Sequence, residues 1–168
     1  FVNKMDRQGA DFLNVVNQVK TMLGSNAVPI VLPIGAEEDF KGVVDLIKNR
    51  AIVWDEAGQG ATFEVVPIPE DMIDEVAEWR EKLLESVADY DETLMEKFFE
   101  DPNSITEREI LDALRSATLD AKIVPMVCGS SFKNKGVQTM LDYVMELLPS
   151  PLDSEGVVGT NPETNEEV

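Results

Sequence analysis

The chain has 168 residues, 43% of them hydrophobic, and its 14 basic and 33 acidic residues give a formal net charge of −19. This composition supports a packed core rather than a disordered chain, and the charge argues against a broad phosphate-binding surface for nucleic acid. With no histidine, neither histidine catalysis nor histidine metal ligands are available within the chain, and no apolar run approaches the ~20 residues of a membrane span.

The single cysteine, Cys128, excludes an internal disulfide and favours a reducing, cytoplasmic location. Because Cys128 stands in an apolar stretch, we expect a buried, unreactive thiol. The chain shows no signal peptide and begins with Phe1-Val2, which resembles the middle of a buried strand. We therefore expect the chain to be a piece of a longer protein.

The first ten residues, FVNKMDRQGA, place a polar segment between that strand and a helix. Open α/β sheets bind ligands in loops just beyond the carboxyl ends of their strands. The pattern NKxD suits guanine, because the Asp6 carboxylate can accept hydrogen bonds from both the ring N–H and the exocyclic amine. Asn3 would offer an amide to the other edge of the base, and the Lys4 stem could lie against the ring. The alternative is a solvated turn that caps the next helix.

The following segment predicts a helix and then a small, mainly antiparallel sheet. The helix covers residues 11–23, ends at Gly24 and carries one apolar face: Phe12, Val15, Val16, Val19, Met22 and Leu23. Residues 28–34 predict an edge or irregular strand, since Pro29 and Pro33 interrupt it. Further strands are expected over residues 40–47, 49–55 and 61–67, with a hairpin-like loop at 57–60.

An acidic helix is expected to begin at Glu70 and Asp71, where carboxylates suit the helix dipole. Its expected inward stripe is Met72, Ile73, Val76, Trp79, Leu83 and Val87. Its outward stripe, which we call the acidic stripe, is Asp74, Glu78, Glu81 and Glu85. The acidic stripe is either a solvated face or a docking surface for a basic partner. It spreads over ~16 Å of helix, too far for one metal ion.

Two further helices and a second strand–loop–helix unit complete the chain. The helix over residues 91–100 is expected to turn Leu94, Met95, Phe98 and Phe99 inward. Thr106 and Glu109 predict a capping box, with Ile105 and Ile110 as its hydrophobic staple, on a helix that ends near residue 118. A strand is expected at residues 122–128, followed by a polar loop at 129–132. The last helix starts near residue 135 and is expected to bury Val137, Met140, Leu141, Val144 and Leu148. Residues 152–168 are polar and predict a linker.

The two polar loops, near residues 3–6 and 129–132, could face the same ligand. Backbone N–H groups of Ser130, Ser131 and Phe132 could donate to a carbonyl oxygen of the base that Asp6 reads from its other edge. About a hundred residues with their own sheet and helices separate the two loops. This order indicates a parallel-sheet domain interrupted by an insertion.

Three long segments, NKMDRQGADF, LPIGAEEDFKGVVDLI and CGSSFKNKGVQ, resemble the elongation factor G family of ribosomal translocation GTPases. The resemblance implies an α/β fold, an incomplete P-loop-GTPase-type parallel sheet interrupted by an α+β insertion subdomain. By this resemblance, residues 1–24 and 119–150 are the C-terminal part of the GTP-binding domain. Residues 25–118 would form the insertion, and residues 151–168 would lead toward a further domain.

The same resemblance assigns roles to particular residues. Asn3, Lys4 and Asp6 match the family's guanine-specificity motif, and Ser130, Ser131 and Phe132 match its second base-contacting loop, although the family usually has Ala in place of Ser131. It implies GTP and GDP as ligands, with Mg in the full-length parent, and the ribosome as partner. The acidic stripe would dock on the large-subunit stalk protein.

The phosphate-binding pattern GxxxxGK[ST] does not occur in the chain. Since phosphate cradling and magnesium ligation account for most catalysis in this reaction class, we expect no catalytic residue, no metal ligand and no GTP hydrolysis in this piece alone. A related translational GTPase, such as a ribosomal-protection protein or a release-factor GTPase, and a non-enzymatic binding module are the alternatives. An exposed sheet edge near Phe1 and residues 122–128 predicts self-association.

Overall fold

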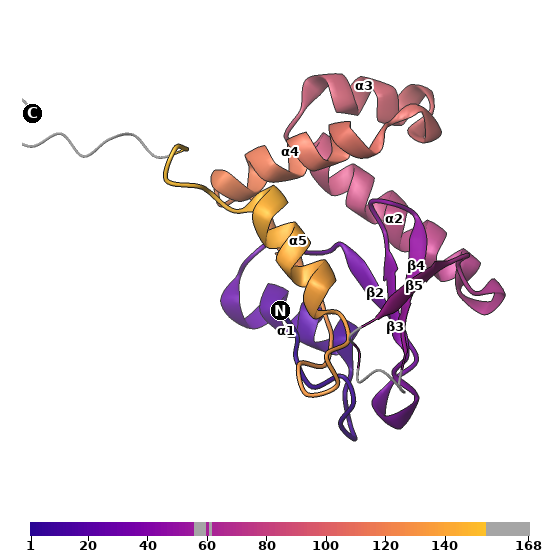
Figure 1. Ribbon diagram of the computed structural model, residues 1–168. Coiled ribbons are helices and arrows are strands. Elements are labelled where there is room, and N and C mark those ends of the chain that lie inside the picture. The colour runs from indigo at the N-terminus through magenta and orange to yellow at the C-terminus, as the bar shows by residue number, and fades with distance from the viewer. Residues whose placement is uncertain (56–59, 61, 154–168) are drawn as a thin grey trace, which may run out of the picture.

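The computed structural model describes residues 1–55, 60 and 62–153. Within this part of the chain, a two-stranded parallel sheet and a four-stranded antiparallel sheet share one hydrophobic core with the surrounding helices. In Figure 1 the loops near residues 3–9 and 129–136 lie together at the bottom, and α3 and α4 lie at the top. The expected α/β fold, with a parallel sheet and an added antiparallel sheet, is confirmed.

The parallel sheet pairs β1 (Ala27–Pro29) with β6 (Val124–Met126). Val2 extends this sheet through an isolated parallel bridge to Cys128, just beyond the end of β6. Strand character at Phe1-Val2 is thus limited to a single bridge, whereas the strand expected near residues 122–128 is present. Cys128 is buried, as expected.

The stretch predicted as one strand, residues 28–34, forms two strands in different sheets. β1 belongs to the parallel sheet, and β2 (Val31–Ile34) is an edge strand of the antiparallel sheet. Ile30 stands between them: its N–H donates to Met126 of one sheet, and its carbonyl accepts from Leu46, just after a strand of the other. Proline at both positions 29 and 33 removes donors that a long central strand would need, which favours the division.

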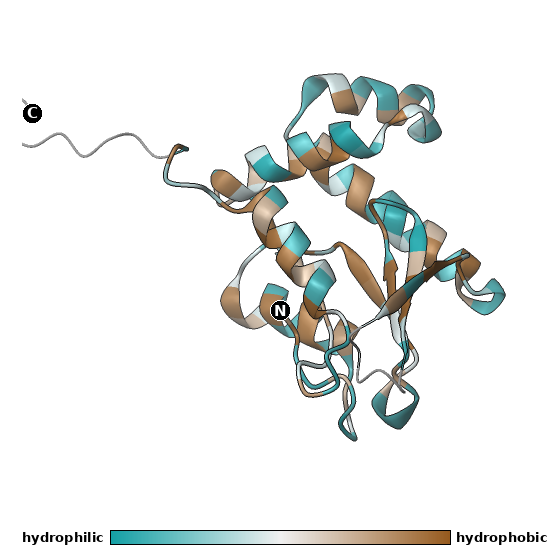
Figure 2. Cartoon of the chain, in the orientation of Figure 1, coloured by the Kyte–Doolittle hydropathy of each residue, from teal (hydrophilic) through white to brown (hydrophobic). Residues whose placement is uncertain are grey.

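The antiparallel sheet has the order β2-β3-β4-β5. Its remaining strands are shorter than expected: β3 (Gly42–Asp45), β4 (Arg50–Trp54) and β5 (Phe63–Val66). The predicted hairpin loop at 57–60 lies outside the described residues except for Gly60. Figure 2 shows that the strands of this sheet are largely hydrophobic, and every residue of β3 is buried.

The first helix, α1 (Phe12–Leu23), begins where the Asp11 carboxylate accepts the Asn14 N–H and ends at Gly24 in the left-handed conformation. It buries Phe12 and Val16 as expected. Met22 and Leu23 were expected inside but are 78% and 74% exposed. The helical spacing of apolar residues continues through the last turn of α1, but no described element packs over that turn.

Helices α2 (Ile73–Ala88), α3 (Glu92–Glu100) and α4 (Glu107–Leu119) pack together, with α2 in contact with both of the others. Val76, Leu83 and Val87 are buried as predicted, whereas Ile73 is 52% exposed. Phe99, predicted inward, is 78% exposed, since only one side of the short α3 faces its neighbours.

The last helix, α5 (Val137–Leu147), presents a different face from the expected one. It buries Thr139, Tyr143 and Leu147, whereas Leu141, Val144 and Leu148 are exposed. On this buried face, the Tyr143 hydroxyl donates to the buried Asp45 carboxylate at 2.6 Å. None of the described helices is long and apolar enough to cross a membrane.

Candidate functional site

The two predicted loops meet through Asn3. Its side-chain oxygen accepts the Lys4 N–H at 2.8 Å and the Ser131 N–H at 3.0 Å. Lys4 adopts a φ of 67°, a conformation that ordinary residues rarely take and that the Asn3 bond helps to hold. The Asn3 side chain, expected to face a base, therefore uses its oxygen to join the loops.

The Asp6 side chain is only 12% exposed and lies at one wall of a cleft. A hydrogen bond from the Ser130 side chain is the main cause that holds the Asp6 pKa below its usual range. The backbone N–H of Asp6 and the charges of Arg7 and Lys133 act in the same direction, and partial burial opposes them. Asp6 is thus an ionised, acceptor-only group at neutral pH, as a reader of two N–H donors must be.

The backbone donors of the second loop are largely engaged. Ser130 donates its N–H to the Lys135 carbonyl at 2.8 Å, and Ser131 donates to Asn3. Of the three N–H groups expected to face a base, only that of Phe132 has no hydrogen bond within the described part of the chain. Phe132 itself is 81% exposed.

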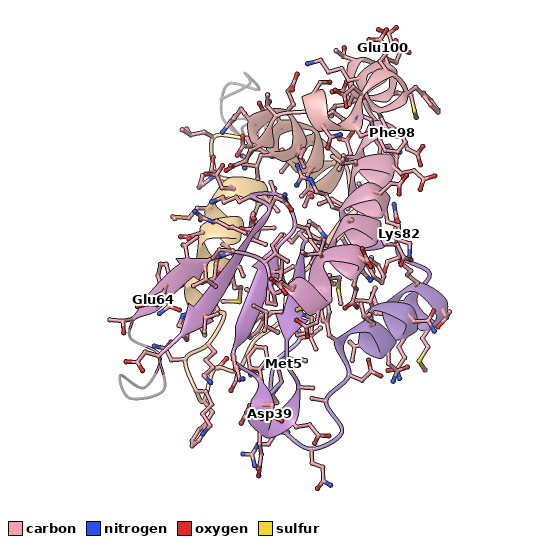
Figure 3. The ribbon with its side chains drawn as sticks, turned by 90° about the vertical axis from the view of Figure 1, so that its right-hand side faces the viewer. Met5, Asp39, Glu64, Lys82, Phe98 and Glu100 are labelled. Atoms are coloured by element: carbon pink, nitrogen blue, oxygen red, sulfur yellow. The ribbon has the colours of Figure 1, made fainter. Side chains whose placement is uncertain are left out.

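A cleft of about 570 Å³ is lined by both loops and by a third segment that sequence reasoning missed. Asp6, Phe132 and Lys133 of the loops contribute to the lining, as do Glu37, Glu38 and Phe40 of the third segment. This third segment is the short helix η1 (Glu37–Asp39) and its neighbours, between β2 and β3. Figure 3 shows Met5 and Asp39 at the same end of the molecule. The motif LPIGAEEDF contains these residues, but nothing local to it indicated contact with Asp6.

The acidic stripe is exposed along α2, as expected for either interpretation. Its charge is partly compensated, because Lys82 forms an ion pair with Glu78 and lies 4.5 Å from the centre of the Trp79 ring. Beside Glu81 the surface is hollowed over about 310 Å³, with an apolar lining that includes Ile73, Ala77 and Leu84. The stripe thus borders an apolar depression rather than a uniformly polar face.

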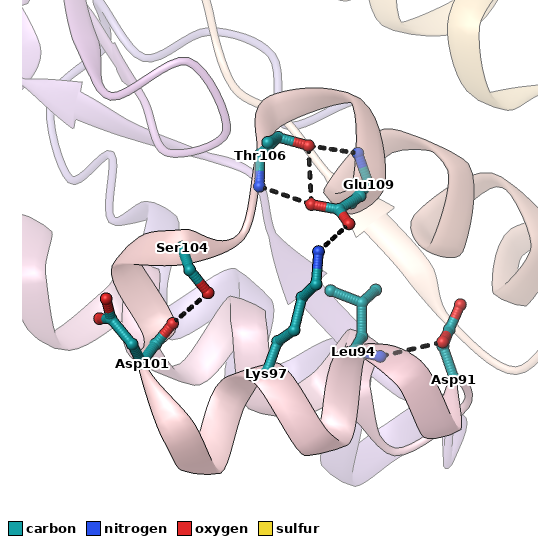
Figure 4. Close-up of polar contacts among 7 residues, drawn as sticks. All are labelled: Asp91, Leu94, Lys97, Asp101, Ser104, Thr106 and Glu109. Atoms are coloured by element: carbon teal, nitrogen blue, oxygen red, sulfur yellow. Dashed lines mark hydrogen bonds and ion pairs between the residues drawn. The ribbon is translucent and has the colours of Figure 1, made fainter.

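Local hydrogen bonds fix α3 and α4, the two helices that pack against α2 (Figure 4). Asp91 caps α3 by accepting the Leu94 N–H at 3.0 Å. The predicted capping box is present, with Thr106 and Glu109 bonded reciprocally at the start of α4. Lys97 of α3 forms an ion pair with Glu109, and these bonds lower the Glu109 pKa to about 2.

Residues 1–150 match the family described as "Elongation factor Tu GTP binding domain", and the chain belongs to that family. It is similar to elongation factor G from Cytophaga hutchinsonii, with 77% identity over 168 residues, which is 100% of this chain and 24% of that protein. It is also similar to elongation factor G from Amoebophilus asiaticus, with 59% identity over 166 residues, 99% of this chain and 23% of that protein. The chain thus spans about a quarter of the length of these relatives, and the predicted resemblance is confirmed.

The fold is similar to that of a crystal structure of a protein from Thermus thermophilus, with a TM-score of 0.76 and 25% identity. That match covers 90% of this chain and 22% of the other. Among the described residues, no group of three or more Cys, Asp or Glu side chains could hold a metal ion.

Proposed function

We propose that this chain is part of a ribosomal translocation factor that binds and hydrolyses GTP in the elongation stage of protein synthesis. The 77% identity to an elongation factor G supports this proposal. Within the parent, residues of the parallel-sheet part read guanine and the insertion offers a docking surface. We place the start of the insertion at Ile30 rather than residue 25, because β1 pairs with β6.

Guanine recognition rests on one observation above all: a largely covered, ionised Asp6 that faces a cleft. Adenine offers no pair of adjacent donors, so binding it would leave the carboxylate unpaired, which penalises the wrong base strongly. In this proposal Asn3 joins the two loops, Lys4 lies against the base, and Phe132 donates its N–H. Ser130 keeps Asp6 ionised, and Ser131 completes the second loop.

The Asp6→Asn variant tests this proposal, because it should change which base is preferred rather than simply abolish binding. An Asn amide can donate where the carboxylate only accepted, so Asp6→Asn should favour xanthine, which carries a carbonyl in place of the guanine amine. NMR titrations of this chain with guanosine and xanthosine, at millimolar concentration, measure the preference. The matched control is Asp39→Asn, the same change at an exposed position that does not line the cleft, which should keep the preference for guanosine. Equal responses of wild type and Asp6→Asn to both nucleosides would contradict base reading by Asp6.

We further propose that the acidic stripe docks on a basic face of the large-subunit stalk protein. The apolar hollow beside Glu81 supports this, since interfaces commonly combine an apolar centre with a charged rim. Opposite charges would steer the encounter, so binding should weaken as salt rises.

The test is a titration of this chain with the isolated C-terminal domain of the stalk protein, at low and high salt. Glu81→Lys with Glu85→Lys should abolish salt-sensitive shifts in α2. Glu64→Lys is a matched control, because Glu64 is exposed on β5, away from α2 in Figure 3. If both variants bound like wild type, the stripe would be a solvated face.

A further inference from the structure

Glu37 is bonded to the loop that carries Asp6 at two points. Its carboxylate accepts the Gly9 N–H at 2.7 Å, and its backbone N–H donates to the Met5 carbonyl at 3.0 Å. Met5 directly precedes Asp6, and Gly9 lies three residues after it. The two bonds therefore fix the path of the chain on both sides of Asp6.

The bonds hold Glu37 in a costly backbone conformation. Its φ is 57°, which a residue with a Cβ rarely adopts without surrounding contacts. The turn before it is equally constrained: a Cβ on Gly35 would lie 2.1 Å from the Asp39 carbonyl oxygen. The η1 segment is thus a tightly held turn with two groups aimed at the Asn3–Gly9 loop.

The antiparallel sheet also contacts the second loop from the same side. Buried Lys135 donates from Nζ to the Phe40 carbonyl at 2.9 Å. The Gly60 carbonyl accepts from the side chains of Asn134 and Gln138, each at 3.2 Å. Trp54 of β4 donates to Gln138 at 3.0 Å. Both loops near the cleft are therefore tied to the inserted sheet as well as to each other.

We propose that Glu37 is a positioning residue of the guanine site, through which the inserted sheet holds Asp6 in the geometry that a base requires. This inference rests on the proposed guanine recognition. Glu37 acts through the loop rather than on the base, so its removal lowers affinity but leaves the choice of base to Asp6. Loss of one charge-assisted bond predicts a reduction in guanosine affinity of about tenfold. The insertion is then not merely appended to the base site but sets its shape.

The first measurement requires no ligand. In NMR spectra of this chain, the Gly9 amide should exchange slowly with solvent. Glu37→Ala should speed Gly9 exchange by about tenfold. Glu37→Gln retains a side-chain oxygen acceptor and should restore much of the protection. Glu38→Ala is the matched control, since Glu38 lines the same cleft and is exposed.

Guanosine and xanthosine titrations of the same variants complete the test. Glu37→Ala should weaken guanosine binding without a switch to xanthosine, and Glu37→Gln should recover affinity. Gly9 exchange in Glu37→Ala equal to that in Glu38→Ala would overturn the inference, as would unchanged guanosine affinity despite faster exchange. If wild type bound no guanosine, base recognition itself would fail, and Gly9 exchange would still decide whether Glu37 holds the loop.

Discussion

Replacement of Tyr143 by Phe should remove one buried hydrogen bond between α5 and the antiparallel sheet while the aromatic ring stays in place. Asp45 is 1% exposed at the end of β3 and accepts three hydrogen bonds. The donors are the Tyr143 hydroxyl at 2.6 Å and the backbone N–H groups of Ile47 and Lys48 at 3.0 and 2.9 Å. Of these three bonds to Asp45, only the one from Tyr143 connects α5 to the sheet, and Tyr143→Phe removes only that bond.

The cost follows from the charge and burial of the acceptor. A hydrogen bond to a charged group contributes roughly 1.5–3 kcal/mol, and the two backbone donors that remain keep Asp45 from being orphaned. For a chain of this size each kcal/mol shifts the midpoint of thermal unfolding by roughly 2–4 °C. We therefore expect Tyr143→Phe to unfold about 3–12 °C below wild type.

Urea and thermal unfolding followed by circular dichroism measure the free energy of unfolding directly. Tyr90→Phe is the matched control, because Tyr90 is 46% exposed just after α2. That change should stay within ~0.5 kcal/mol of wild type, as surface changes usually do. A Tyr143→Phe protein as stable as Tyr90→Phe would refute the view that this bond ties the two parts together.

The same bond predicts a response to alkali. Burial, aided by the nearby Asp45 charge, raises the Tyr143 pKa well above its usual value near 10. Because the Tyr143 pKa is higher in the folded than in the unfolded chain, the stabilisation from the protonated hydroxyl is complete below about pH 10 and is lost as pH rises further. Wild type should lose up to about 1.4 kcal/mol per pH unit there, and Tyr143→Phe should lack that slope, so the two stabilities converge.

Three other predictions concern the acid response, the exposed helix face and the reaction. The lowered Glu109 pKa means that the ionised carboxylate stabilises the fold above pH 4.5, and that this stabilisation is lost as pH falls toward 2. Glu109→Gln should remove this acid-dependent loss, which urea unfolding at several pH values measures. Light scattering over a range of concentrations should show that the chain self-associates. Met145→Glu, at a position 76% exposed on α5, should reduce the self-association. A wild-type chain that stayed monomeric at all concentrations would contradict the prediction. The isolated chain should release no phosphate from GTP, and turnover retained after Asp6→Asn would point to a contaminating enzyme.

Local signals in the sequence were sufficient for most of the elements. The Thr106 and Glu109 capping box, the Asp11 and Gly24 helix boundaries and the buried Val76, Leu83 and Val87 all follow from short-range rules. Such rules work because a helix satisfies its backbone and places its apolar face within a few residues. The long motifs also identified the family before any fold was known.

Contacts between distant residues decided the rest. α5 has two apolar faces, and the inward one carries long-range bonds to the inserted sheet, from Tyr143 to Asp45, 98 residues away, and between Gln138 and Trp54. The sequence predicts one strand over residues 28–34, but β1 pairs with residues near 125 and β2 pairs with residues near 44.

The role that we propose for Asp6 follows from the four-residue pattern NKxD, because the chemistry that suits a guanine base is local to that pattern. The hydrogen bonds by which Glu37 and Ser130 hold Asp6 and its loop could not be predicted from the sequence. Hydrogen-bond partners about 30 and 120 residues apart leave no periodic signal along a single chain. The sequence by itself therefore determined most of the elements and the carboxylate that we propose reads the base. The tertiary structure decided which faces are buried and which side chains hold Asp6, because long-range contacts depend on where whole elements meet.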